Sequence, residues 1–318
     1  MNSDRLKHFP ISFFAVVLGL SGYTIALQKS EAMLHFPLII SHYLMMMTFM
    51  LTAVLILFYS AKSLKYFKEV QADFSHPVRM NFTPAIFITF LLASILTLEI
   101  HKDLSKVLWL IGVFGQSTIF LSTISKWTHN TNIEVHHFNP AWFIPAVGNI
   151  LVPVAGVEHF NKEISWLFFS VGLVFWIVLL TIFYNRIFFH HPLPERLLPT
   201  LFLLIAPPAV GFISYVKLTG IIDAFAKILY YFALFNLIML IFQFDTFKKI
   251  NFYLSWWAYS FPITAFTVAS ILFYHKTGMI GYQYLAMTVL VLATLLILFL
   301  IYRTIIAIFI NKEICVEE

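Results

Sequence analysis

Prolines inside long apolar runs are the first feature of this sequence with a chemical consequence. Pro145, Pro153, Pro207 and Pro208 lie within such runs, and proline has no N–H to donate to the hydrogen-bond ladder of a helix. Each of these prolines is therefore expected to kink a helix and to start a new half-helix, whose free N–H groups and positive dipole end attract anions. The alternative is that the prolines only bend helices so that they pack.

Two arginines stand directly before proline-containing apolar runs. Arg79 ends the segment His76-Pro77-Val78-Arg79, and Arg196 ends Leu193-Pro194-Glu195-Arg196. At the mouth of a membrane protein, such arginines form a vestibule that raises the local concentration of anions. The alternative is that they only orient the chain in the membrane, with Glu195 neutralising Arg196.

Patterns typical of metal sites and catalytic sites are weak. The histidine doublets His136-His137 and His190-His191 cannot present the i, i+4 ligand pair of a helical metal site. No glycine-rich phosphate loop and no nucleophile–base pair stands out, and the single cysteine, Cys315, excludes an intramolecular disulfide. We therefore expect no metal, no cofactor and no enzymatic activity, with a membrane-embedded metal or haem enzyme as the alternative.

The elements that position these residues are predicted to be membrane-spanning helices. Of the 318 residues, 60% are hydrophobic and 11% are charged, whereas soluble domains have roughly 45–50% apolar and about 25% charged residues. A spanning helix needs about 20 apolar residues. The apolar runs predict ten helices at 10–27, 37–62, 83–101, 105–127, 140–158, 163–189, 198–217, 221–247, 252–275 and 279–311. The sequence thus predicts an all-α integral membrane protein and excludes a large soluble catalytic or nucleic-acid-binding domain.

The prolines fall almost entirely in the odd-numbered predicted helices. Irregular backbone at membrane depth is tolerated only where protein or a water-filled cavity surrounds it. The odd helices are therefore predicted to form an inner ring, and the smooth, leucine- and isoleucine-rich even helices an outer layer. The chain then consists of one helical hairpin used five times.

Charged residues are unevenly distributed between the two ends of the predicted spans. Thirteen of the 20 lysines and arginines fall on the side that carries both termini. Because cytoplasmic loops carry an excess of lysine and arginine, both termini are expected in the cytoplasm. Glu99, Glu158 and Lys227 lie toward the outer ends of their spans. The sequence therefore shows no continuous relay of buried carboxylates of the kind a proton-coupled pump uses.

The ninth predicted helix contains an unusual run of aromatic residues, small residues and a proline, Trp256-Trp257-Ala258-Tyr259-Ser260-Phe261-Pro262. This run resembles the tellurite-resistance/dicarboxylate transporter family, which includes bacterial TehA and the plant slow-type anion channels. Phe9-Pro10, the segment 139–147 and Ala206-Pro207-Pro208-Ala209 agree with that family in the same order. The resemblance covers essentially the whole chain.

This resemblance implies a fold and an assembly. The fold is a ring of five helical hairpins around a central pore, with inner helices kinked by proline. The single transmembrane channel domain then covers 1–318, with short cytoplasmic tails at 1–9 and 312–318. Protomers are expected to form a homotrimer in which each copy has its own pore.

The resemblance also implies roles for individual residues. Phe261, beside Pro262, matches the phenylalanine that plugs the pore in that family. A phenyl ring closes a narrow pore by its bulk and by removing water. Phe14, Gly19 and Phe266 are the other expected pore-lining residues, and Phe266 is the nearest competitor of Phe261 as the gate.

The expected function is that of a passive anion channel in the cytoplasmic (inner) membrane of a bacterium. Small monovalent anions such as chloride and nitrate would pass through one gated pore per protomer. The alternative is a secondary carrier that exports C4-dicarboxylates, sulfite or tellurium oxyanions. The expected partners are small inorganic or organic anions, the lipid bilayer and further copies of the chain, with no nucleic acid.

Overall fold

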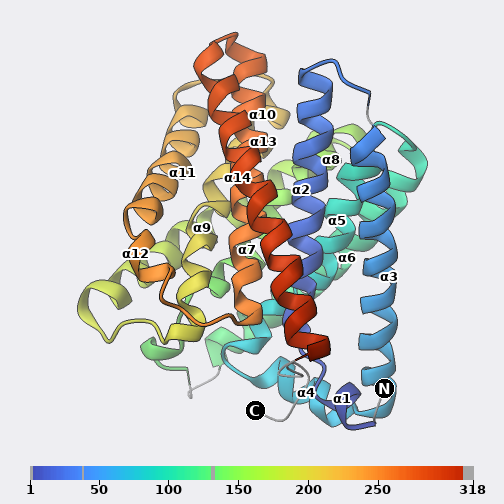
Figure 1. Cartoon of the computed structure of the whole chain (residues 1–318), viewed down its shortest axis with the longest axis vertical. Helices are drawn as coiled ribbons and strands as arrows, with labels where there is room; N and C mark the ends of the chain where they lie inside the picture. The colour runs from blue at the N-terminus through green and yellow to red at the C-terminus, as the bar shows by residue number, and fades with distance from the viewer. Residues whose placement is uncertain (1–2, 38, 130–132, 311–318) are drawn as a thin grey trace.

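The computed structural model describes residues 3–37, 39–129 and 133–310, which form helices joined by short connections (Figure 1). Ten of the helices in these described ranges are long and apolar enough to cross a membrane. Helix α1 (Ser3–Lys7) and the last described residue, Ile310, lie at the same end, which we call the lower end after its place in Figure 1. The opposite end is the upper end. The predicted all-α membrane fold is confirmed, while the expected tail at 312–318, with Cys315, lies outside the described residues.

The five odd-numbered spans form a closed inner ring. They cover Ile11–Met33, Arg79–Thr97, Pro140–His159, Glu195–Thr219 and Leu254–Thr277. Around this ring α2 (Phe14–Met33) packs against α5 (Ala85–Thr97), α5 against α7 (Ile144–Leu151), α7 against α10 (Ala206–Thr219), α10 against α13 (Ser260–Thr277), and α13 against α2. In the most apolar stretch of each inner span, between 67% and 94% of the residues are buried. The predicted inner ring is confirmed.

Each inner span forms a hairpin with the outer helix that follows it. The outer helices are α3 (Ile39–Lys65), α6 (Lys102–His129), α9 (Lys162–Phe189), α11 (Ala224–Phe242) and α14 (Ile280–Ile305), the last continued by the π-helical turn η7 (Ile306–Ile310). Only 22% to 39% of the residues in their most apolar stretches are buried. Large apolar side chains such as Leu57, Phe114 and Ile228 are exposed on them. These outward faces suit lipid, in which helices satisfy all their own backbone groups.

Every inner span begins at the lower end with a 3-10 segment before it continues as an α-helix. The segments are η1 (Ile11–Phe13), η2 (Arg79–Phe82), η4 (Pro140–Phe143), η5 (Glu195–Leu204) and η6 (Leu254–Tyr259). Pro145 is the second residue of α7, Pro207 and Pro208 follow the first residue of α10, and Pro262 is the third residue of α13. N–H groups in the first turn of an α-helix have no partner within the helix, so proline loses no hydrogen bond there. The prolines therefore mark the change from 3-10 to α-helix.

The fifth span is broken between α7 and α8 (Pro153–His159). Two backbone carbonyls next to the break accept hydrogen bonds from side chains of neighbouring helices. Trp109 Nε1 of α6 donates to Val152 O at 2.9 Å, and Ser214 Oγ of α10 donates to Ile150 O at 2.5 Å. Backbone acceptors at membrane depth have no water to bond, so these side chains make the irregular segment tolerable there.

The first span is longer than the sequence predicts. The predicted helix 10–27 ends too early, because α2 continues to Met33. Its upper end contains the buried Glu31, whose carboxylate accepts hydrogen bonds from the N–H of Ser41 at 3.3 Å and from the Ser41 hydroxyl at 2.6 Å. Polar residues that end a span in sequence are thus kept helical by partners on the next helix.

Two short helices also differ from the prediction. The predicted helix 221–247 is in fact α11 followed by the separate α12 (Phe244–Phe247). Helix α4 (Phe67–Ser75), which buries Val70 and Asp73 against the rest of the chain, was not predicted at all. At nine residues it is too short and too polar to stand out as a span.

Candidate functional site

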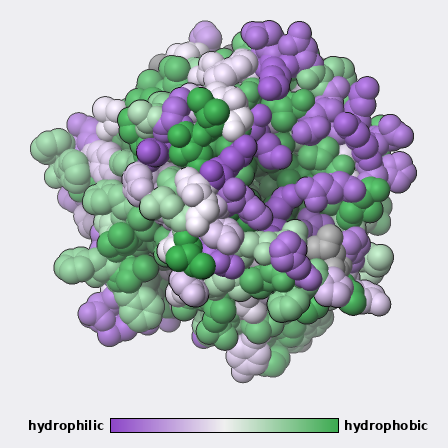
Figure 2. Space-filling view, turned by 90° about the horizontal axis from the view of Figure 1, so that it is seen from above, coloured by the Kyte–Doolittle hydropathy of each residue, from purple (hydrophilic) through white to green (hydrophobic). Residues whose placement is uncertain are grey.

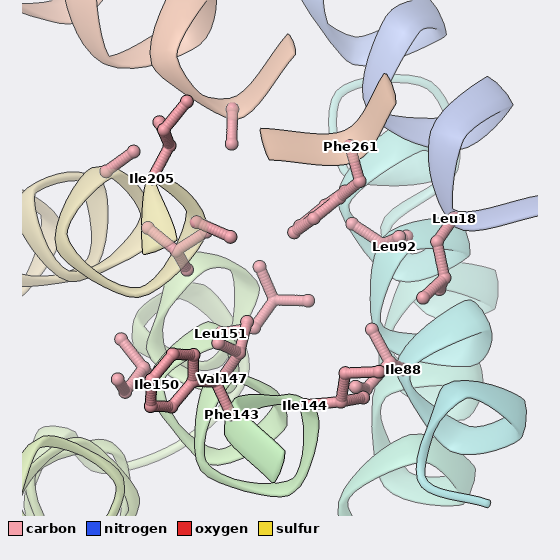
Figure 3. Packing of buried hydrophobic residues seen from close by; sticks show 14 of the residues in the cluster. Leu18, Ile88, Leu92, Phe143, Ile144, Val147, Ile150, Leu151, Ile205 and Phe261 are labelled. Carbon is pink, nitrogen blue, oxygen red and sulfur yellow. The ribbon is translucent and has the colours of Figure 1, made fainter. Parts of the chain in front are cut away.

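Phe261 lies at the centre of the inner ring. It is the second residue of α13, directly after η6, and only 8% of it is exposed. Its ring points away from α13 into the space that the inner spans enclose, toward Leu92 and Leu151 (Figure 3). The start of α13 is held locally, because Ser260 Oγ donates to Trp257 O at 2.6 Å. The sequence-predicted gate residue thus occupies the middle of the ring.

Phe261 separates two small cavities of about 40 Å³ each. It is the one side chain that lines both of them, and every other lining residue is apolar or glycine. Each cavity has room for only a few water molecules, and its apolar lining offers them almost no hydrogen-bond partner. Phe261 therefore lies between the two cavities inside the inner ring. We call Phe261 together with the linings of the two cavities the waist.

The waist is built in two levels, one helical turn apart. Each inner span contributes a residue to the lower level and the residue four positions later to the upper level. The five pairs are Leu18 and Gly22, Ile88 and Leu92, Val147 and Leu151, Ala206 and Val210, and Phe261 and Ala265. Because residues four apart in an α-helix lie on the same face, each inner helix turns one face toward the centre.

Gly22 makes room for the phenyl ring of Phe261. A Cβ atom at Gly22 would lie 3.1 Å from Phe261 Cδ2 and 2.5 Å from Thr264 Oγ1. Both distances are shorter than ordinary carbon contacts, so any larger residue would push the ring or α13 away. Gly22 was not among the residues predicted from the sequence.

The three other predicted pore-lining residues pack between helices. Phe14 is fully buried and meets Tyr59 of α3 edge-on at 5.9 Å between ring centres. Phe266 stacks on Tyr230 of α11 at 5.5 Å. A Cβ atom on Gly19 would lie 2.0 Å from the hydroxyl oxygen of the first residue of α13, so this glycine lets α2 and α13 cross closely. The linings of the two cavities include none of the three.

The two predicted vestibule arginines are exposed at the lower end. Arg79 Nη1 lies 3.2 Å from Asp73 Oδ1, and the other oxygen of Asp73 lies 2.7 Å from Nζ of the buried Lys62. Two cations share one carboxylate, so this cluster keeps one net positive charge. The guanidinium of Arg196 lies 5.7 Å from the ring centre of Tyr253. Arg79 and Arg196 thus belong to different clusters.

The histidine doublets lie at the lower end, away from the waist. His136 and His137 form part of the short 3-10 segment η3 (Val135–His137), where His136 Nδ1 lies 3.1 Å from Glu134 Oε2. Within the part of the chain that the structure describes, no three histidine, cysteine or acidic side chains are placed to hold a metal ion.

Comparison with known proteins identifies relatives of this chain. The family described as voltage-dependent anion channel (SLAC1) matches residues 8–305. The S-type anion channel SLAH3 of Arabidopsis thaliana is 30% identical over 315 residues, covering 97% of this chain and 50% of that protein. The guard cell S-type anion channel SLAC1 of the same plant is 26% identical over 315 residues, covering 96% of this chain and 57% of that protein. The chain therefore spans about half the length of these plant relatives.

A bacterial relative is matched over nearly its whole length. The tellurite resistance protein TehA homolog of Haemophilus influenzae is 25% identical over 310 residues, covering 95% of this chain and 93% of that protein. The resemblance seen in the sequence is thus confirmed for both the plant and the bacterial branch. Since the family match runs from residue 8 to residue 305, this chain belongs to the voltage-dependent anion channel (SLAC1) family.

Proposed function

We propose that this chain is a passive channel for small monovalent anions such as chloride and nitrate, with one pore per chain that Phe261 occludes. The observation that carries the proposal is the position of Phe261 between two cavities lined by all five inner spans. A single phenyl ring at this point separates the two halves of the path. Its rotation moves no charge, and an apolar constriction gates by excluding water.

The chemistry of the waist supports selection by ease of dehydration. Its lining contains no ionisable side chain, so nothing there replaces the water that an ion sheds. The cost of passing is therefore lower for an anion that holds its water weakly. We expect nitrate to pass more readily than chloride, and sulfate to pass poorly.

The common direction of the inner helices supports the passage of anions over cations. All five inner spans begin at the lower end, so the positive ends of their dipoles converge there. The cluster of Arg79, Lys62 and Asp73 adds one net positive charge at the same end, and Arg196 is exposed there too. These charges concentrate anions at the lower mouth, which is the vestibule role predicted for the two arginines.

Orientation and assembly follow from the same proposal. The excess of lysine and arginine on the terminus-bearing side supports a cytoplasmic lower end, in the inner membrane of a bacterium. The family resemblance supports a homotrimer in which each copy conducts separately. Native mass measurement of the detergent-solubilised protein tests the assembly, and protease access to a tag at either terminus in sealed vesicles tests the orientation.

The gate is tested by ion-substitution electrophysiology on the wild type and on Phe261→Ala. The substitution joins the two cavities, so anion current should rise at least about tenfold, which corresponds to about 1.4 kcal/mol off the barrier. Phe266→Ala is the matched control, because it removes the same side chain from the same helix but on the side that packs against Tyr230. Equal currents in wild type and Phe261→Ala, with both proteins correctly assembled, would show that Phe261 is not the gate.

The carrier alternative makes a different electrical prediction. A channel gives reversal potentials that follow the anion gradient at every pH, whereas a proton-coupled carrier gives potentials that shift with the proton gradient. Flux that saturates and depends on pH, in the absence of Nernstian anion current, would favour the export of dicarboxylates, sulfite or tellurium oxyanions over the proposed channel.

A further inference from the structure

Each inner span has a charged residue near its upper end that is accessible to solvent, in addition to the buried Glu31 of α2. The five residues are Lys29 of α2, Glu99 just beyond α5, Glu158 of α8, Lys217 of α10 and Lys276 of α13. We call these five residues the upper charge ring. Figure 2 looks down onto this end and shows hydrophilic side chains crossing the middle of the face among hydrophobic ones. The pattern is not visible along the sequence, because the five positions come from five separate hairpins.

Lys217 occupies a special place in the upper charge ring. The charges of all four other members, Lys29, Glu99, Glu158 and Lys276, act on it electrostatically. These four residues belong to the four other inner spans. Lys217 also lies on the face of α10 that lines the waist, because it follows Val210 by seven residues and Ile213 by four, and both of these residues line the upper of the two cavities. Lys217 therefore lies above the waist, at the upper end of the same helix face.

The other charges of the ring are engaged by partners. Lys29 Nζ lies 2.6 Å from Glu99 Oε1, and Glu158 Oε2 lies 3.9 Å from Nζ of Lys102 on the outer helix α6. Lys276 Nζ donates a hydrogen bond to the backbone carbonyl of Gly220 at 2.9 Å.

Lys217 differs from these residues. It is exposed, and in the described part of the chain its ammonium group forms no hydrogen bond or ion pair. Both carboxylates of the ring have a nearer lysine, at 2.6 Å and 3.9 Å. The positive charge of Lys217 is therefore not cancelled by a direct partner, and its three donors point at no protein acceptor.

We propose that Lys217 binds a small monovalent inorganic anion over the upper mouth of the pore, as the first site that an anion meets from that side. This proposal rests on the proposed channel function for its physiological meaning, but not for the binding itself. The paired carboxylates keep the site weak, because they hold the net charge of the ring to a small positive value. A weak site collects anions without trapping them, as conduction requires.

The size of the effect follows from Coulomb's law in a watery mouth. One unit charge about 5 Å from a bound anion changes its affinity by roughly three- to fivefold at water-like dielectric. Removing Lys217 should therefore raise the half-saturating anion concentration by about that factor when the anion is supplied at the upper side. The effect of the same substitution on anion supplied at the lower side should be smaller.

The charge test compares three variants with the wild type. Lys217→Gln should raise the half-saturating nitrate concentration at the upper side. Glu99→Gln frees Lys29 and should lower the half-saturating nitrate concentration at the upper side. Lys227→Gln is the matched control, because Lys227 is exposed at the upper end of α11, outside the ring. Equal values in Lys217→Gln and Lys227→Gln would overturn the proposed site even if the wild type conducts anions.

A binding measurement separates this site from the proposed function. Nitrate that binds the folded protein raises its unfolding temperature in detergent, relative to the large anion isethionate at the same ionic strength. We expect the nitrate-dependent rise to be reduced in Lys217→Gln and unchanged in Lys227→Gln. If the wild type passes no anion but its nitrate effect is reduced in Lys217→Gln, the channel is disproved and the site is supported. If the nitrate effect is unchanged in Lys217→Gln, the site is disproved.

Discussion

The waist around Phe261 is lined only by apolar residues and glycine, whereas the upper charge ring has five ionisable residues at the upper ends of the same inner spans. An ion in the waist loses water and gains nothing in its place, so small changes in bulk or polarity there act on the whole barrier. An ion at the ring keeps most of its water, and the charges reach it through a screened medium. The comparison teaches that, in the proposed channel, closing the path and collecting the ion are separate tasks, with effects of very different size.

The largest effect is expected from side-chain size at position 261. Anion current should rise in the order Phe261, Phe261→Leu, Phe261→Val, Phe261→Ala, because each step widens the passage between the two cavities. The whole series should span at least about tenfold in current. Current measured at fixed voltage and fixed expression checks the order. A series without order would mean that the waist is closed by something other than this ring.

The next largest effect is expected from a single hydroxyl at the waist. Val147 lines the lower cavity, so Val147→Thr keeps the shape of the side chain and offers water one hydrogen bond there. In the Phe261→Ala background it should raise anion current severalfold. Val17→Thr is the control, since Val17 is fully buried on α2 and lines neither cavity. If both substitutions raised current alike, the polarity of the waist would not set the barrier.

A smaller effect, and the sharpest contrast between the two regions, is expected from salt. The Debye length is about 10 Å at 0.1 M and about 3 Å at 1 M ionic strength. The roughly three- to fivefold effect of Lys217→Gln should therefore fade between these conditions, when the added salt is an impermeant one. The ratio of currents between Phe261→Ala and wild type should stay the same. A salt-dependent gate ratio would show that charge, and not bulk, closes the waist.

The smallest effect is expected from the exposed ion pair of the ring. The hydrogen bond and charge of Lys29 hold the pKa of Glu99 below its ordinary value of 4.5. Such a carboxylate contributes stability that is complete above pH 4.5 and is lost as pH falls through the lowered pKa. The difference in melting temperature between wild type and Glu99→Gln should therefore be small, worth at most about 1 kcal/mol, and should shrink below pH 4.5. A difference that stays constant from pH 7 to pH 3 would contradict the pairing.

The architecture could be predicted from the sequence because its signals are local. Ten apolar runs of spanning length, with prolines in alternate runs, already separate inner from outer helices. The upper end of α2 was missed because Lys29 and Glu31 look like residues that end a membrane helix, and only partners from other helices explain why they lie inside one. The short α4 was missed because nine residues of mixed polarity do not stand out as a span.

The lining of the waist could not be predicted in the same way. An inner helix is buried on every side, so hydrophobicity does not show which face turns toward the axis. Phe14 and Phe266 have the right residue type but face outer helices, while the small Gly22 faces the ring of Phe261. Family resemblance indicated Phe261 as the gate, and this role stays a prediction; the structure places Phe261 between the two cavities.

The grouping of five residues into the upper charge ring could not be predicted from the sequence either, although each residue is visible there. Glu99 and Glu158 read as ordinary residues at the interface, because nothing along the chain shows that they belong to one ring of helices with Lys217. Residues spread over about 250 positions converge only when α13 packs back against α2 and closes the ring. Long-range closure of this kind has no local signal.

The two levels of the waist are not symmetric around the axis. In a ring of five identical subunits, every side chain that faces the axis occurs five times. One large side chain therefore cannot plug such a pore without four copies beside it. Here one chain supplies all the helices, and the lower level holds residues of different sizes: Leu18, Ile88, Val147, Ala206 and Phe261. The backbone repeats around the axis while the side chains do not. That broken repetition lets a single phenylalanine lie at the centre, and in the proposed channel a single substitution is enough to open it.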